Sequence, residues 1–143
     1  MEIKYKKQEG QEIGLLKLDN GYNLRGNRKL IMRPYQIADM HTGIYIKIPE
    51  GYKLEALSIT RILKETGIDI VGDNTFDENF DGELVITIKN TKSSMFVIEE
   101  GMPISKLVAT KVEYATLTDG KKAKAEEPKE EVKEEQKTIT EKK

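Results

Sequence analysis

Apolar and polar residues alternate in two segments of the chain, 43–49 and 83–88. Alternation with a period of two is typical of a strand that buries one face and exposes the other. The first segment ends at a Pro-Glu-Gly turn, and the second follows a glycine. We therefore predict two strands whose apolar faces lie in the core. The expected core side chains are Ile44, Ile46, Ile48, Leu84, Ile86 and Ile88.

Shorter apolar runs separated by turn residues predict further strands at 13–18, 30–32, 54–63, 95–98 and 104–117. The segment 54–63 has a helix as an alternative, because Leu54, Leu57 and Ile62 could share one helical face. The β-rich neighbours of that segment favour a strand. Many short strands without a convincing amphipathic helix predict an all-β sandwich or closed barrel.

The stretch from Gly67 to Ile88 organises this predicted fold. Two β-rich runs flank an acidic loop at residues 77–82, which indicates a long hairpin with an exposed tip. The loop carries carboxylates, an aromatic ring and Gly82, and a glycine lets the backbone come close to a ligand. We expect the binding site near this loop.

The same loop has part of a calcium-binding pattern. Asp77, Asn79, Asp81 and Gly82 match the first half of an EF-hand loop in spacing. The twelfth position, which is a bidentate glutamate in such loops, is Ile88, and the flanking residues favour strands. We interpret the loop as the acidic turn of a hairpin and predict no metal ligands in it.

The composition changes at the end of the chain. From Gly120 onward there are eight lysines and seven glutamates, and Val132 and Ile139 are the only large apolar residues. Burial cannot order such a segment, although Glu–Lys pairs three residues apart can support transient helix. We predict a β domain at 1–118 and a solvated Lys/Glu-rich tail at 119–143, disordered or partly helical, with an interaction arm as the alternative.

Composition also argues against several functions. The 24 lysines and arginines nearly balance the 25 acids, so there is no basic footprint for nucleic acid. Without cysteine there is no disulfide or thiolate zinc site. We interpret the single histidine, His41, as a surface or hydrogen-bonded group rather than a catalytic base. No segment has the pattern of a membrane span or an export signal, which favours a cytoplasmic protein without a membrane partner.

Several motifs follow one another in a fixed order along the chain. They are Asp19–Arg25, Thr42–Tyr52, Gly67–Ile68, Phe76–Leu84, Asn90 and Gly101–Val108. In order and spacing they resemble the trimeric dUTPase family. The resemblance covers roughly residues 15–110, and the coincidence of several motifs is far more specific than any one of them.

This resemblance implies a distorted jelly-roll β-barrel that forms a homotrimer with nucleotide sites between subunits. It also implies hydrolysis of dUTP to dUMP and pyrophosphate with Mg²⁺. Asp77 occupies the position of the family aspartate that activates water, a general-base role. Phe80 stands where the family has a tyrosine that packs under the deoxyribose, and a phenyl ring keeps most of that surface.

The sequence departs from the family at other site positions. Asn23 replaces an aspartate that holds metal-bound water, and Arg61 is followed by Ile62 where the family has an Arg-Ser pair that grips phosphate. Pro103 and Lys106 replace the arginine and glutamine of the last motif. The glycine-rich arm with a phenylalanine that closes over the triphosphate is missing, and a lid of that kind excludes water.

Two functional hypotheses follow. The first is a catalytically degraded dUTPase-like homotrimer that acts as a binding or structural protein, such as a bacteriophage product that decorates a capsid or binds a host factor. In that case it would be virion-associated, with a viral or host protein as partner. The alternative is a divergent active dUTPase that uses Mg²⁺, with Asp77 as the catalytic residue. The residues expected to contact dUTP or a related nucleotide are Asn23, Arg61, Phe80, Gly82 and Lys106.

Overall fold

The computed structural model of the protein describes residues 2–18 and 21–120. The chain divides into two compact units, Met1–Val112 and Glu113–Lys143. The predicted tail, apart from residues 119 and 120, lies outside the described residues.

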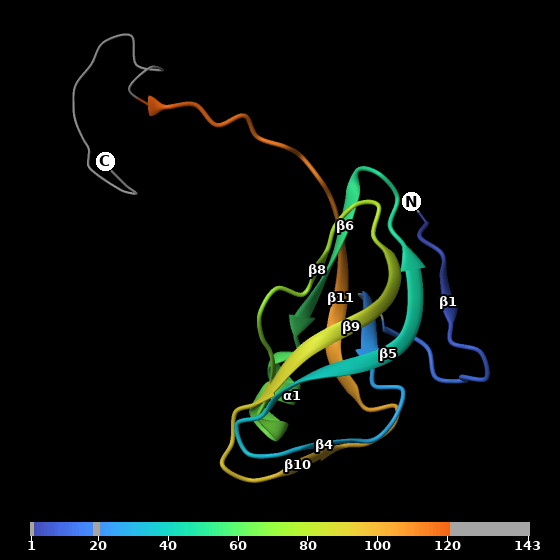
Figure 1. The fold of residues 1–143 in the computed structure, drawn as a ribbon, viewed down its shortest axis with the longest axis vertical. Helices are drawn as coiled ribbons and strands as arrows, with labels where there is room; N and C mark the ends of the chain where they lie inside the picture. The colour runs from blue at the N-terminus through green and yellow to red at the C-terminus, as the bar shows by residue number, and fades with distance from the viewer. Residues whose placement is uncertain (1, 19–20, 121–143) are drawn as a thin grey trace. The chain divides into compact units, whose positions relative to one another are not determined.

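The described residues form eleven strands and one helix (Figure 1). Their bounds are β1 Tyr5–Lys7, β2 Leu16–Leu18, β3 Gly21–Arg25, β4 Leu30–Met32, β5 Ile37–Lys47, β6 Tyr52–Ser58, α1 Thr60–Thr66, β7 Ile68–Ile70, β8 Thr75–Phe76, β9 Asp81–Asn90, β10 Phe96–Ile98 and β11 Pro103–Lys111. The prediction of an all-β protein is confirmed.

The strands form three antiparallel sheets. The first has the order β1-β5-β9-β7 and the second β2-β3-β11-β6-β8, while β4 and β10 pair only with each other. Figure 1 shows the β4–β10 pair at the lower end of the unit, below the crossing of β5 and β9. We call these two strands and the loops at their tips the β4–β10 arm. Because β5 and β9 pair along most of their length, they form the centre of the first sheet.

The core lies between the sheets and contains the predicted residues. The six side chains expected from alternation on β5, its C-terminal extension and β9 are each no more than 6% exposed. Burial of such large aliphatic side chains contributes about 1.5–3 kcal/mol each. The alternation therefore predicted the buried faces of the two central strands correctly.

The prediction of a strand over 54–63 is wrong in its second half. Strand β6 ends at Ser58, and α1 begins at Thr60. Ile62 is the buried residue of this short helix. The helix ends at Thr66 and is capped by Gly67, which has a φ of 79° and donates its N–H to the Leu63 carbonyl (2.8 Å). A helix that buries one residue leaves almost no periodic signal, and this explains the error.

The predicted hairpin around residues 67–88 exists only in part. Strands β7 and β9 pair, with Ile68 opposite Asn90. Strand β8, however, leaves this sheet and pairs with β6 in the other one. The prediction of a strand to residue 117 is also too long, because β11 ends at Lys111. Among the described residues, no helix has the length and apolar character needed to cross a membrane.

Candidate functional site

The acidic loop between β8 and β9 is held firmly against the turn that follows β5. The Phe80 N–H donates to the Asp77 carbonyl (3.1 Å), which closes the loop on itself. Ile48 makes two backbone hydrogen bonds to the loop, with its N–H to the Phe80 carbonyl (2.9 Å) and its carbonyl to the Asn79 N–H (3.0 Å). The loop therefore presents the exposed Asp77 carboxylate from a fixed backbone.

Side chains strengthen this attachment. A carboxylate oxygen of Glu78 accepts a hydrogen bond from the Gly51 N–H at 2.7 Å. Asn79 has a φ of 71°, a left-handed conformation that asparagine tolerates better than most residues. The Glu78 carboxylate thus helps to fix the loop, whereas Asp77 and Asp81 are exposed to solvent.

Phe80 forms an aromatic surface beside Asp77. Its ring lies 5.0 Å from the ring of Phe76, at an interplanar angle of 62°. This edge-to-face geometry is a favourable one for aromatic pairs. A Cβ placed on Gly82 would lie 3.5 Å from Cζ of Phe80, so the ring covers the glycine. Phe80 and Gly82, both predicted site residues, are therefore brought together next to Asp77.

Asn23 and Lys106 form a second group on the five-stranded sheet. They are direct cross-strand partners on β3 and β11. Asn23 is only 9% exposed, whereas Lys106 is exposed. Cβ atoms of directly opposed residues lie about 4.5–5.5 Å apart. A lysine at the position opposite Asn23 adds positive charge to this part of the sheet, which does not favour a divalent cation there.

One copy of the chain does not bring Asp77 to this second group. Lys106 is opposite Leu57 on β6, and Phe76, the last residue of β8, is opposite Leu54. Extending that register by one residue would place Asp77 opposite Lys53, four residues along β6 from Leu57. With about 3.3 Å per residue and about 4.8 Å between strands, Asp77 and Lys106 are roughly 16 Å apart in the sheet. The predicted residues therefore form two separate groups within one chain.

Arg61 and Ile62 lie on α1. The Arg61 guanidinium pairs with the carboxylate of Glu65 at 3.1 Å, and both side chains are well exposed. Ile62 points the other way, into the hydrophobic core, and is 7% exposed. The position after Arg61 therefore presents no polar group to solvent.

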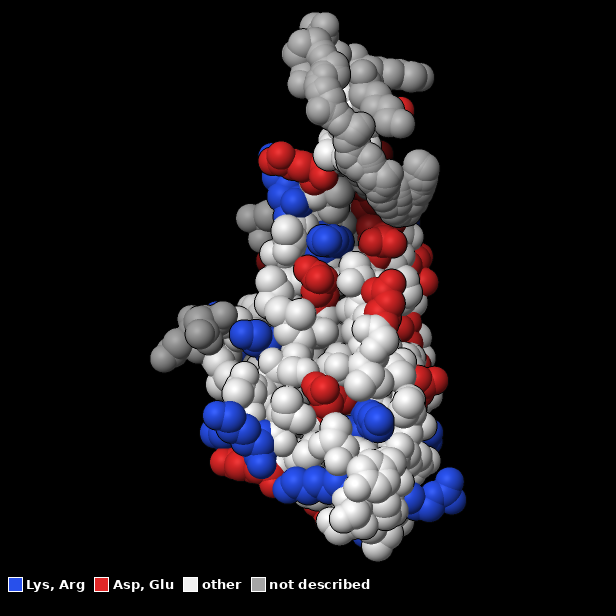
Figure 2. All heavy atoms as spheres, turned by 90° about the vertical axis from the view of Figure 1, so that its left-hand side faces the viewer, with Lys and Arg blue, Asp and Glu red and all other residues white. Residues whose placement is uncertain are grey.

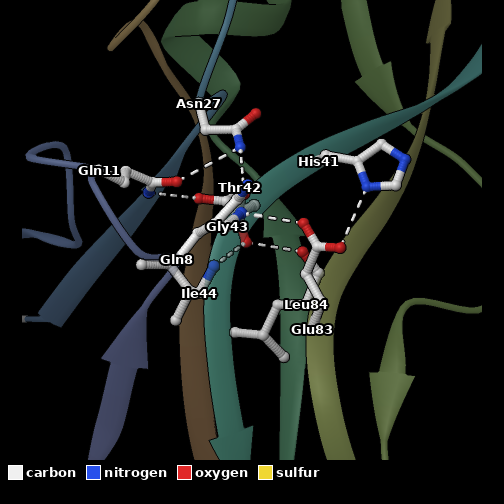
Figure 3. A network of polar contacts seen from close by, with 9 residues as sticks. All are labelled: Gln8, Gln11, Asn27, His41, Thr42, Gly43, Ile44, Glu83 and Leu84. Atoms are coloured by element: carbon white, nitrogen blue, oxygen red, sulfur yellow. Dashed lines mark hydrogen bonds and ion pairs between the residues drawn. The ribbon is translucent and has the colours of Figure 1, made fainter.

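His41 and Glu83 belong to a polar network that the sequence did not reveal (Figure 3). Nδ1 of His41 lies 3.2 Å from Oε1 of Glu83, and Oε2 of Glu83 accepts from the Gly43 N–H (3.0 Å). The interpretation of His41 as an exposed, hydrogen-bonded group is confirmed. The β5–β9 register shifts between His41 and Tyr45, so the network surrounds a β-bulge.

Gln11 joins the N-terminal segment to the same bulge. Its amide nitrogen donates to the carbonyls of Thr42 (2.9 Å) and Ile13 (2.6 Å), and the Thr42 hydroxyl donates to the Leu84 carbonyl (2.7 Å). Figure 3 shows Gln11 on one side of the bulge and Glu83 on the other. The only sequence signal for this arrangement was Gly43, which has a φ of 67°.

Metal ligands do not gather within the described part of the chain. Across residues 2–18 and 21–120, no three acidic, histidine or cysteine side chains are placed to hold an ion together. The loop of Asp77, Asn79 and Asp81 is flanked by strands β8 and β9. Since these two strands belong to different sheets, the loop connects the sheets and the prediction that it is the turn of a hairpin is wrong.

Comparisons with known proteins identify the family. The family model of dUTPases matches residues 16–134. The deoxyuridine 5'-triphosphate nucleotidohydrolase of Chlamydia pneumoniae is 32% identical over 109 residues, which cover 74% of this chain and 75% of that protein. The enzyme of the same name from Chlamydia trachomatis serovar L2 is 30% identical over 94 residues, and this match spans 65% of each protein.

Solved structures agree with this result. The dUTPase of Staphylococcus bacteriophage 80alpha with dUPNHPP superimposes with a TM-score of 0.74, covering 93% of this chain and 92% of that chain at 20% identity. A variant of the dUTPase from phage phi11 of S. aureus, which coordinates a structural Mg(II) ion, has a TM-score of 0.73 at 18% identity, covering 83% and 96%. The chain belongs to the dUTPase family, and its sheets form the distorted jelly-roll of that family.

Proposed function

We propose that this protein is a dUTPase-family homotrimer that has lost triphosphate hydrolysis and acts as a binding or structural protein. The observation that carries the proposal is the burial of Ile62 in the core, at 7% exposure, beside an Arg61 that is paired with Glu65 at 3.1 Å. Where the family grips phosphate with an Arg-Ser pair, this chain has no hydroxyl at position 62, and its Arg61 has Glu65 as an exposed partner that competes with phosphate.

The Asn23–Lys106 pair supports the same conclusion. A Mg²⁺–triphosphate complex needs hard, negatively charged oxygen ligands. Asn23 is neutral and faces a lysine across the strand pair. The residues present therefore do not fit Mg²⁺ at this position.

A homotrimer is part of the proposal because the two groups of site residues lie so far apart in one chain. A second copy would have to supply the missing group if Asp77 were to meet Asn23 and Lys106. Closed symmetric assembly is the usual way for such a composite site to form. The outer face of the second sheet also exposes Leu18, Leu57 and Val108, which a neighbouring copy could bury.

The direct test is a hydrolysis assay. Purified full-length protein is incubated with dUTP and Mg²⁺, and pyrophosphate is measured. We expect a turnover number far below ~1 s⁻¹, which is the lower end of the range for ordinary enzymes. Turnover at or above that rate would refute the loss of hydrolysis, while leaving family membership intact.

A divergent active dUTPase is the second candidate, and the intact Asp77 loop favours it. Asp77 is exposed on a fixed loop beside the Phe80 ring, as a general base next to a nucleoside platform would be. If this candidate is correct, Asp77→Asn abolishes turnover without changing the oligomer. Asp81→Asn is the matched control, because Asp81 is an exposed carboxylate of the same loop and should retain activity.

Nucleotide binding without hydrolysis is tested separately. Titration calorimetry with a non-hydrolysable dUTP analogue measures affinity independently of turnover. We expect Phe80→Ala to weaken any binding, because it removes the aromatic surface over Gly82. Binding that is unaffected by this change would exclude the loop as the nucleoside site.

A further inference from the structure

The outer face of the β4–β10 arm is apolar where a solvent-facing strand pair is ordinarily polar. Ile31 is opposite Val97 in the register, and continuing that register places Arg33 opposite Met95. Ile31 is 52% exposed and Met95 61% exposed. Since the opposite face, with Met32 and Ile98 fully buried, already packs on the core, this outer face is a second apolar surface without a partner among the described residues.

The tip of the arm carries a strained aromatic residue. Arg33, Pro34, Tyr35 and Gln36 form a turn closed by the Gln36 N–H and the Arg33 carbonyl (3.1 Å). Tyr35, at the third position, has a φ of 58°, which glycine adopts freely and a large side chain does not. Its side chain is 58% exposed, so no burial compensates for the strain. Strain held without local compensation points to a role for the side chain itself.

The arm is rigid rather than loosely attached. The side chain of Asn90, which is fully buried, donates to the carbonyls of Arg33 (3.2 Å) and Ser94 (2.8 Å) and so joins both tip loops. Tyr35 also donates its N–H to the Lys92 carbonyl (3.3 Å). The apolar face and Tyr35 are therefore presented in one fixed arrangement, which lowers the entropy lost on binding.

The charge at the Tyr35 end of this surface is positive. Arg33 and Lys92 lie in the two loops at that end, and residues 30–36 and 91–98 contain no acid. At the other end, continuing the register places Glu99 opposite Lys29, so charges of both signs meet there. Figure 2 shows lysine and arginine side chains, with some acidic ones among them, at the lower end of the unit, where Figure 1 places β4, β10 and α1.

We propose that the β4–β10 arm is a docking surface for an acidic polypeptide segment that carries its own apolar side chains. The positive charge at the Tyr35 end complements acidic residues and steers them toward the surface. The face itself is aliphatic, with Ile31, Met95 and Val97, and Tyr35 at the tip is the exposed ring of the arm. Because single-stranded nucleic acids bind to several stacked aromatic side chains, this surface favours a protein over a nucleic acid. Face-to-face pairing with a second copy would bring like charges together, which opposes self-association through this surface.

The test uses the full chain and defined probes. Binding is measured by fluorescence anisotropy for a labelled peptide of alternating glutamate and leucine, with a glutamate–serine peptide, a lysine–leucine peptide and oligo(dT) as comparisons. We expect the glutamate–leucine peptide to bind at least about tenfold more tightly than each of the others. Tighter binding of oligo(dT), or equal binding of the lysine–leucine peptide, would overturn the proposal.

Variants locate the site. Ile31→Ser with Met95→Ser should weaken binding of the glutamate–leucine peptide by about tenfold or more, because two exposed apolar contacts are lost. Tyr35→Gly should weaken it too, while raising the urea midpoint of unfolding because the strained turn is relieved. Tyr114→Gly, which removes a tyrosine that is 78% exposed outside the arm, is the matched control and should leave binding unchanged.

Two results would contradict the site assignment. Undiminished peptide binding by both arm variants would place the peptide elsewhere. A change in sedimentation mass of the Ile31→Ser/Met95→Ser variant would instead make the surface a contact between copies. Neither result depends on whether the protein hydrolyses dUTP, so this proposal stands or fails separately from the proposed function.

Discussion

Asn90 shows how one buried polar side chain connects distant parts of the fold. Its amide nitrogen donates to the carbonyls of Met32, Arg33 and Ser94, and its carbonyl accepts from the Lys92 N–H (3.1 Å). Two of these partners are 58 and 57 residues away in the sequence. Removing this side chain takes a hydrogen bond from each of its partners, and a buried polar group without a hydrogen bond lowers the stability of the fold.

We predict that Asn90→Ala destabilises the protein by about 3 kcal/mol, since a fully buried side chain and its hydrogen bonds to both tip loops are lost together. Urea unfolding followed by circular dichroism measures the change. Asn27→Ala is the control, because Asn27 makes two long hydrogen bonds of 3.3 Å and its Oδ1 has no partner. A loss for Asn90→Ala no greater than that for Asn27→Ala would contradict the role assigned to Asn90.

At the scale of elements, the β-bulge in β5 depends on Gly43. Its φ of 67° is costly for other residues, and a Cβ there would collide with the side-chain amide of Gln11. Gly10 has a similar φ of 83° but open space around it. An alanine at Gly10 would therefore add only backbone strain, whereas an alanine at Gly43 would add backbone strain and a collision with Gln11.

Gly43→Ala should destabilise the protein by about 2–3 kcal/mol, and Gly10→Ala by about 1 kcal/mol. Urea unfolding of the two variants measures both changes in the free energy of unfolding. Adding Gln11→Ala to Gly43→Ala should recover part of the loss by removing the collision, although Gln11 also loses its hydrogen bonds to Thr42 and Ile13. Equal effects of the two glycine substitutions would show that Gln11 moves aside freely.

The elements also show what a sequence can and cannot predict. Alternation found the buried faces of β5 and β9, because period-two burial is a local property of a strand. It missed α1, which buries one residue, and the transfer of β8 to the sheet of β6. Strand partners are decided by contacts between distant segments, and these leave no local pattern.

At the scale of the whole molecule, the proposed homotrimer can be tested by sedimentation. We expect a mass three times the 16.3 kDa of one chain. Leu57→Glu with Val108→Glu should dissociate it, because charges would be placed on the apolar outer face of the second sheet. Ile31→Ser is the control on a different surface, and a single-chain mass for the unmodified protein would contradict the proposal.

The sequence predicted some residues of the candidate site but not how all of them are arranged. The resemblance to dUTPases indicated Asp77, Phe80 and Gly82, and the structure brings these three together. It could not show that Asp77 and Lys106 lie far apart in one chain, because that separation follows from the strand register. Glu83 and Gln11 were missed since their partners become neighbours only through the bulge.

Strand β1 covers one side of β5, with Tyr5 opposite Ile46 and Lys7 opposite Ile44. Its own free edge is short and rich in lysine, which discourages the addition of further strands. A chain shortened to begin after Gln8 would expose a long strand with unpaired backbone groups, and such an edge is a template for aggregation. In the full chain, the three exposed residues of β1 therefore help to keep the protein in solution. We expect the shortened chain to give higher turbidity than the full chain at the same concentration.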